Sequence, residues 1–312
     1  MTHFLYQGCC FDDLYYSDDA NCKIRIYIDW SSCDIPLNGT TAYVYHANGE
    51  FYKMLGPFSN PYMIDFSLPK GEYNMLLHNN TPFELQNLKF SKIENAETFE
   101  VSTIENNESK HNKKNVLEPN VIALAHIYDL YITEKMINYY PNKPSYIEHN
   151  INKEIKLQTE VLTSEIEIRV NVKGLNNAAG APISELRNLV EGIKLMSKEK
   201  TKNRVNQEFI LNNRTFNDNS KKDGFISKKL ISFGFHDNSE VRYILYMNFI
   251  LVNGDKYPIT MDITDKIKEI EKLKYKIEVE CTLPNVPSIG DGDSGFNPDI
   301  EEWEDIEVDV PM

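Results

Sequence analysis

The sequence predicts an all-β fold, arranged as two β-sandwich domains in tandem. Its 312 residues include 18 tyrosines and 15 phenylalanines, and aromatic residues favour strands. Apolar and polar residues alternate in many short segments, which is typical of half-buried strands. Turn sequences rich in Asn, Gly and Pro separate these segments at short intervals, as they do in sandwiches and barrels.

Strands are predicted throughout the N-terminal half. Between residues 22 and 30, Ile24, Ile26 and Ile28 share one face and polar side chains occupy the other. A hairpin is expected at Asn48-Gly49, because Asn-Gly favours the tight turns that join antiparallel strands. The expected strands are residues 22–30, 42–47, 51–55, 62–68, 72–78 and 155–162.

Two further stretches of this half are less regular. Residues 103–119 are polar and have no apolar period, so they predict a long exposed loop. Residues 121–132 are apolar, and their pattern fits either a strand or a short helix.

The C-terminal half begins with a segment that resembles the first strand. Residues 168–172 (IRVNV) are similar to residues 24–28 (IRIYI), which suggests an internal duplication. Asn253-Gly254 predicts another hairpin turn. The expected strands are residues 165–174, 189–196, 208–211, 230–236, 241–252, 257–263, 275–283 and 304–310.

Only two stretches have a helical spacing of apolar residues. In residues 182–192, Ile183, Leu186 and Val190 are three and four positions apart, and residues 265–273 have an apolar residue at every third position. Such spacing favours a helix. Both stretches are also short enough to be loops or single turns between strands.

The net charge and the cysteine content argue against several kinds of partner and against a zinc site. The formal net charge is −14, which argues against nucleic acid and against an anionic membrane surface as partners. The chain has five cysteines without CxxC spacing, so no zinc site is expected. Cys22 and Cys33 could form a disulfide in an exported protein, or could be buried thiols.

The N-terminus resembles the end of a bacterial lipoprotein signal. Phe4, Leu5 and Tyr6 are apolar, Gly8 is small, and Cys9 and Cys10 follow. A lipidated cysteine is expected in this position, with the rest of the signal lying upstream of residue 1. The alternative is an ordinary N-terminal strand or tail. No stretch has the roughly 20 apolar residues that a transmembrane helix needs.

Two motifs near the C-terminus partly match a protease nucleophile and a calcium-binding loop. Residues 292–295 (GDSG) match the nucleophile region of chymotrypsin-like proteases, but no histidine occurs in a matching context and too little chain follows. Residues 291–302 partly resemble a calcium loop with Glu302 at its last position, yet Gly295 replaces a ligand and no helices flank it. We therefore predict no catalytic residue, metal or cofactor, and a protein that is not an enzyme.

Histidines and aromatic residues leave a binding role open. We expect His111 to be solvated and His126 to be a core histidine. Tyr15-Tyr16, Phe51-Tyr52 and Tyr139-Tyr140 are candidate sugar platforms, with one ring of each pair inward and one outward, because adjacent strand residues face opposite sides. A glycan-binding surface module is therefore the alternative function.

Four segments, in order along the chain, carry a resemblance to a known family. They are residues 10–16 (CFDDLYY), residues 22–30 ending in Asp29-Trp30, residues 68–73 (LPKGEY) with Asn79, and the C-terminal segments 259–267, 295–298 and 303–310. This ordered set resembles lipoproteins related to the fimbrillins and fimbrial anchor proteins of Gram-negative gut and oral anaerobes, in a branch annotated largely as domains of unknown function.

The resemblance implies an organisation, a location and partners. It implies that the two sandwich domains are transthyretin-like. The pattern of the residues themselves places a truncated signal and tether at residues 1–21, the first domain at residues 22–162 and the second at residues 163–312. It implies attachment to the outer membrane through a lipid on Cys9 or Cys10, with Asp12-Asp13 as the acidic segment that directs the protein to the cell surface. Fimbrial subunits, host molecules or glycans are the implied partners, and the role is structural or adhesive.

The last predicted strand is the candidate for strand exchange. Ile306, Val308 and Val310 alternate with acidic residues, and a sandwich with open edges can accept or donate a strand. We expect this terminal strand to pair within its own domain rather than with a neighbouring molecule.

Overall fold

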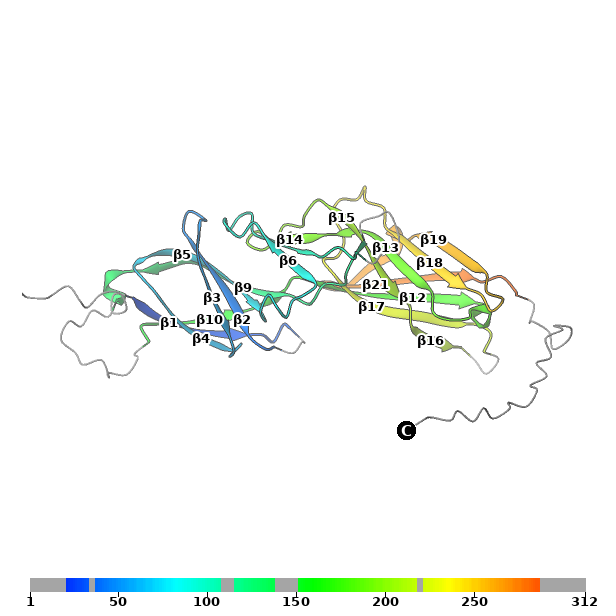
Figure 1. The fold of residues 1–312 in the computed structure, drawn as a ribbon, viewed down its shortest axis with the longest axis horizontal. Helices are drawn as coiled ribbons and strands as arrows, with labels where there is room; N and C mark the ends of the chain where they lie inside the picture. Colours follow the sequence, from blue (N-terminus) through cyan, green and yellow to red (C-terminus); the bar gives the residue numbers. More distant parts are fainter. Residues whose placement is uncertain (1–20, 34–36, 108–114, 138–150, 218–220, 287–312) are drawn as a thin grey trace, which may run out of the picture.

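The computed structural model describes residues 21–33, 37–107, 115–137, 151–217 and 221–286. Two β-sandwiches lie end to end along the long axis (Figure 1). The part of the chain that is described contains strands and three short 3-10 turns but no α-helix. The predicted all-β sandwich fold is therefore confirmed.

The first sandwich packs a three-stranded sheet on a five-stranded sheet. The sheet orders are β10-β1-β4 and β11-β9-β5-β2-β3. Ile24 and Ile26 of β1 are fully buried between the sheets, together with Ala42 and Val44 of β2. Its strands are β1 (Cys22–Asp29), β2 (Thr40–His46), β3 (Phe51–Phe58), β4 (Met63–Leu68), β5 (Gly71–Asn79), β9 (Ala123–Ile132), β10 (Lys153–Gln158) and β11 (Glu160–Val161).

The second sandwich is built from two five-stranded sheets, β16-β17-β12-β21-β20 and β19-β18-β13-β15-β8. Alternation along β12 again buries one row, Ile166, Ile168, Val170 and Val172, in the core. Its strands are β8 (Asn115–Val116), β12 (Ser164–Lys173), β13 (Ile183–Val190), β15 (Arg204–Ile210), β16 (Asn213–Phe216), β17 (Gly224–Ser232), β18 (Ile244–Ile250), β19 (Lys256–Asp262), β20 (Ile267–Glu271) and β21 (Lys274–Thr282).

The two sandwiches share one pattern of strand pairing. β1 lies between an antiparallel β4 and a parallel β10, and β12 lies between an antiparallel β17 and a parallel β21. In the facing sheets, β2 lies between β3 and β5, and β13 lies between β15 and β18. The similarity between residues 24–28 and 168–172 thus falls on equivalent strands, which supports the predicted duplication.

Three strands form a separate small sheet where the sandwiches meet. β6 (Leu88–Ser91) and β7 (Glu100–Thr103) come from the chain between β5 and β9, and β14 (Gly192–Lys194) comes from the second half. We call this sheet, with the order β14-β7-β6, the junction sheet. The pairings of β7 with β14 and of β8 with β15 cross the predicted domain boundary at residues 162 and 163, which itself stays a prediction.

The predicted helix at residues 182–192 is wrong, because this segment is β13. A register shift lies between Arg187 and Leu189, and Asn188 adopts φ = 68°. The extra residue of a bulge changes which residues face the core. Of the three residues with helical spacing, Ile183 is half exposed, Leu186 lies in the core of the second sandwich, and Val190 lies in a different buried cluster. Their spacing therefore does not reflect one buried face.

The second helical stretch and the long loop also differ from the predictions. Residues 264–266 form a 3-10 turn and residues 267–271 form β20, with its own register shift between Glu269 and Glu271. Within the predicted loop at 103–119, Asn115 and Val116 are buried and pair with β15. The pattern of residues 121–132 fitted either a strand or a short helix, and the structure has a strand there, β9.

Several local predictions are confirmed. Both Asn-Gly turns close hairpins: Gly49 N donates to His46 O at 2.9 Å, and Gly254 N donates to Leu251 O at 2.8 Å. Cys22 and Cys33 are buried thiols with no disulfide between them, so burial is the alternative that the structure supports.

Candidate functional site

Most residues singled out for function lie outside the described residues. This holds for Tyr15-Tyr16, His111, Tyr139-Tyr140, the motifs at 291–302, the lipidation candidates Cys9 and Cys10, and the terminal-strand residues Ile306, Val308 and Val310. Those assignments therefore stay predictions. Within the described ranges, no group of three or more His, Cys, Asp or Glu side chains is arranged to hold a metal ion, and no helix is long and apolar enough to cross a membrane.

The junction sheet brings the two halves into direct backbone contact. Leu195 N, just after β14, donates to Phe99 O at 2.8 Å, and Thr103 N donates to Glu191 O at 3.0 Å. Gly192 lies so close to β7 that an added Cβ would meet Val101 O at 2.2 Å. The pairing of β14 with β7 therefore requires glycine, which has no Cβ, at position 192.

A third hydrophobic core, which we call the junction core, fills the space beneath this sheet. It combines residues of sheet β11-β9-β5-β2-β3 and of the segment that carries β6 and β7 with residues of the second half. Its buried members are Tyr43, Tyr45, Leu76, Leu85, Leu88, Ala96, Phe99, Val101, Ile122, Leu124, Leu162, Val190, Ile193, Leu195 and Phe233. A shared core of this kind resists independent movement of the sandwiches.

Aromatic rings dominate the centre of the junction core. Phe99 lies edge-on to Tyr43, with ring centroids 4.8 Å apart, and His78 stacks on Phe90 at 4.9 Å. His78 Nδ1 is 2.8 Å from Asn79 O, while its Nε2 has no partner. Complete burial lowers the pKa of His78 to about 4, and burial raises the pKa of Tyr43 to about 12. Both groups are therefore neutral at physiological pH.

The turn after β14 also contacts the outer face of β9. His126 Nε2 lies 2.9 Å from Leu195 O, and Tyr128 Oη donates to Met196 O at 3.4 Å. Lys198 forms an ion pair with Glu160 of β11. Burial lowers the pKa of His126. His126 thus packs as a structural residue, consistent with the expectation that it is a core histidine.

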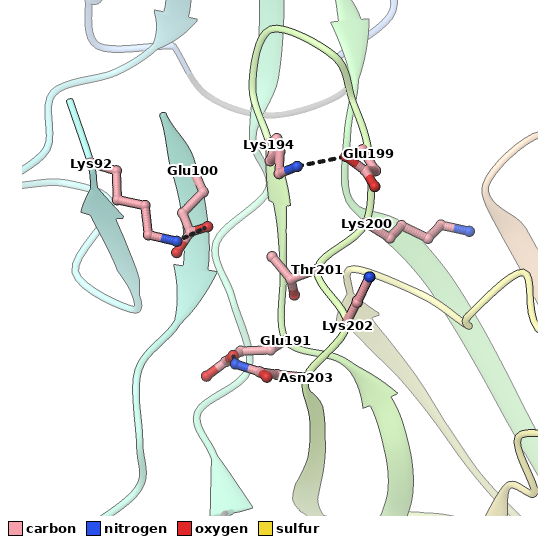
Figure 2. Close-up of a pocket in the computed structure, with 9 residues that line it drawn as sticks. All are labelled: Lys92, Glu100, Glu191, Lys194, Glu199, Lys200, Thr201, Lys202 and Asn203. Atoms are coloured by element: carbon pink, nitrogen blue, oxygen red, sulfur yellow. Dashed lines mark hydrogen bonds and ion pairs between the residues drawn. The ribbon is translucent and has the colours of Figure 1, made fainter. Parts of the chain in front are cut away.

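A groove of about 250 Å³ lies beside the junction sheet (Figure 2). Ion pairs between neighbours occupy much of its lining: Lys92 with Glu100 at 3.0 Å and Lys194 with Glu199 at 2.6 Å. Asn203 donates to Glu191 at 2.6 Å on its floor. Exposed pairs of this kind contribute little stability. The groove can offer hydrogen bonds to a polar ligand, but its described residues contain no activated nucleophile or base.

Among the described residues, exposed aromatic side chains occur on β9 as well as at the predicted pair Phe51-Tyr52. Tyr128 and Tyr131 of β9 are 55% and 52% exposed. Phe51 and Tyr52 were expected to face opposite sides, but each is about a third exposed, because a register shift between Val44 and Tyr45 interrupts the alternation opposite them. Phe51 packs on Tyr45, and Tyr52 packs on His46 and Tyr73.

Replacing Gly192 by Ala should separate β14 from β7 and lower the free energy of unfolding by about 2–3 kcal/mol, because the new methyl group overlaps a backbone oxygen that cannot move freely. Gly180→Ala is the matched control, since nothing lies within 4 Å of its added Cβ. Urea denaturation of both variants measures the difference. Equal stabilities would show that the close approach at Gly192 has no energetic weight.

The fold defines a class of protein: duplicated β-sandwiches joined by a core of their own, with no group of side chains arranged to hold a metal ion among the described residues. The chain belongs to the family described as Domain of unknown function (DUF5119), whose model matches residues 8–210. A comparison with curated proteins gave no match.

Solved structures similar to this chain come from Bacteroides and Porphyromonas species. A candidate adhesin from Bacteroides ovatus is 16% identical, with a TM-score of 0.55 over 91% of this chain and 100% of that one. A candidate adhesin from Bacteroides thetaiotaomicron is 11% identical, with a TM-score of 0.51 over 85% and 93%. The fimbrial anchor protein Mfa2 from Porphyromonas gingivalis is 10% identical, with a TM-score of 0.46 over 83% and 90%. The family model and the two adhesin structures confirm the predicted resemblance at the level of fold.

Proposed function

We propose that this chain is a non-catalytic surface lipoprotein with a structural or adhesive role. The observation that carries the proposal is the junction core, which is shared by both sandwiches and makes one elongated body of them (Figure 1). A body of this shape can hold a binding surface away from the membrane and resist bending under load. The adhesin descriptions of the similar structures agree with such a role.

Attachment is proposed to occur through a lipid on Cys9 or Cys10, which places the protein at the outer membrane. Residues 4–8 have the character of the end of a lipoprotein signal, and Asp12-Asp13 follow the cysteines. The polar segment up to residue 21 would then act as a tether between the lipid and β1. Fimbrial subunits or host molecules are the proposed partners of the exposed surfaces.

Metabolic labelling with a fatty-acid analogue tests this proposal, with the gene expressed from its native upstream DNA. Wild type should take up label, and either Cys9→Ala or Cys10→Ala should lose it. Cys281→Ala is the control, because this buried thiol of β21 lies far from the N-terminus in sequence. Protease treatment of intact cells should degrade the wild type. Absence of both label and degradation would exclude a surface lipoprotein.

Glycan binding is the second candidate, and the exposed rings of β9 favour it. Tyr128 stacks on His126 with an interplanar angle of 4°, and its hydroxyl is held by Met196 O. An exposed ring in a fixed orientation is suited to stacking on a sugar face. If this candidate is correct, Tyr128→Ala should abolish binding on a glycan array. Tyr62→Ala should not, although Tyr62 is equally exposed, at 59%.

A further inference from the structure

β10 forms one outer edge of sheet β10-β1-β4. Thr159 N, just after β10, donates to Asp29 O of β1, whereas Ile28 N donates to Tyr62 O on the β4 side. Along a strand, the backbone N–H and C=O groups of successive residues point alternately to the two sides. The backbone groups of odd-numbered residues in β1 and β10 therefore point toward each other. The backbone N–H and C=O groups of Glu154, Lys156 and Gln158 therefore point away from the sheet, and no described strand pairs with them.

Most other sheet edges carry features that prevent further pairing. β19 contains Pro258, and both β3 and β20 have register shifts. At the edge formed by β4, Ser67 O already accepts a hydrogen bond from the Lys53 ammonium group of β3, at 3.3 Å. The remaining edge strands, β6, β8, β11, β14 and β16, have two to four residues. β10 has six residues with no proline, glycine or register shift.

The solvent face of β10 carries alternating charges. In the row that crosses the sheet, Asp65, Arg25 and Glu154 lie side by side. Arg25 donates two hydrogen bonds to Asp65, at 2.8 and 2.7 Å, and these bonds hold the pKa of Asp65 below its usual value. Glu154 receives only a 3.4 Å contact from Tyr27 Oη, and Lys156 takes part in no ion pair within the described ranges.

We propose that the outer edge of β10 is a self-association surface, at which two copies of this chain pair antiparallel about a two-fold axis at Ile155. In this register Glu154 lies opposite the partner's Lys156, and Lys156 lies opposite the partner's Glu154. The edge is therefore complementary to itself in charge, as a two-fold interface requires. This association is independent of the proposed lipid anchor and adhesive role.

The backbone geometry fits the same register. Glu154 and the partner's Lys156 form a hydrogen-bonded pair, and the two such pairs exchange about four backbone hydrogen bonds. Ile155 then lies opposite its own copy, and the half-buried Ile155 and Leu157 gain cover from the partner. β10 runs toward the second sandwich, so an antiparallel pair directs the two second sandwiches in opposite directions and they do not meet (Figure 1).

Sedimentation velocity of the full chain over a range of concentrations tests the proposal. Wild type should form a dimer. Glu154→Lys and Lys156→Glu should each raise the dimer dissociation constant at least about tenfold, because two attractive pairs become two repulsive ones. The double variant Glu154→Lys/Lys156→Glu restores both pairs and should recover the dimer. Thermal unfolding verifies that all variants are folded.

Three results would overturn the proposal. Wild type could be monomeric at every concentration. This result overturns the proposal also where hydrogen exchange shows that another segment of the same chain protects the amides of Glu154 and Lys156. Dimerisation could be unaffected by either single substitution, which would place the interface elsewhere. The double variant could associate no better than the single variants, which would exclude pairing in this register.

Discussion

Phe99→Ala is expected to lower the free energy of unfolding by about 4 kcal/mol, the cost of removing a large aromatic side chain from a packed core. Phe99 is fully buried and contacts the rings of Tyr43, Tyr45 and Phe90. Its carbonyl also accepts the hydrogen bond from Leu195 N across the junction. The loss should therefore destabilise both sandwiches together, as measured by urea denaturation followed with probes in each half.

Phe83→Ala is the matched control for this prediction. Phe83 is 86% exposed, so its removal should change the free energy of unfolding by no more than about 0.5 kcal/mol. If Phe99→Ala destabilised only the first sandwich and left the unfolding of the second unchanged, the junction core would not couple the two.

Acidification from pH 6.5 to pH 4 is expected to lower the free energy of unfolding by about 3 kcal/mol through His78 alone. The buried imidazole has a folded pKa of about 4, below its ordinary value of 6.5. In this range the unfolded chain binds a proton that the folded chain does not, so stability falls as the pH falls. The contribution is complete above pH 6.5 and is lost by about pH 4.

His78→Phe separates this contribution from the others. Phenylalanine keeps a ring between Tyr43 and Phe90 but cannot ionise. The variant should retain only the smaller pH dependence of His126 and His236, whose pKa values are also lowered, mainly by burial. Carboxylates with lowered pKa values, such as Asp65 and Glu134, reduce the free energy of unfolding only below about pH 4.5, where the unfolded chain binds their protons first. Equal pH profiles of wild type and variant between pH 6.5 and 4.5 would contradict the assignment.

Alternation and turn chemistry account for the parts of the fold that could be predicted. β1 and β12 bury every second residue, and both Asn-Gly turns close hairpins, because these features depend on neighbours within a few residues. β13 was mistaken for a helix because Ile183, Leu186 and Val190 happen to have helical spacing, although they do not share one buried face. The bulge at Asn188 also interrupts the two-residue alternation that would have indicated a strand. No local signal marks such a bulge in a single sequence.

The junction could not be predicted for a different reason. β14 has only three residues, and β8 has two, too few for a period to be visible. Their partners are about 90 residues away along the chain. Gly192 is needed only because Val101 O of β7 approaches it, and this contact exists only after both sandwiches have formed. The predicted lipidation and terminal-strand residues lie outside the described ranges, so they remain predictions.

Differential scanning calorimetry of the full chain tests most directly whether the junction core makes one unit of the two sandwiches. If it does, a single transition is expected in which the van't Hoff and calorimetric enthalpies agree, as in all-or-none unfolding. Two transitions, or a van't Hoff enthalpy of about half the calorimetric value, would show that the sandwiches unfold independently and that the junction core does not couple them.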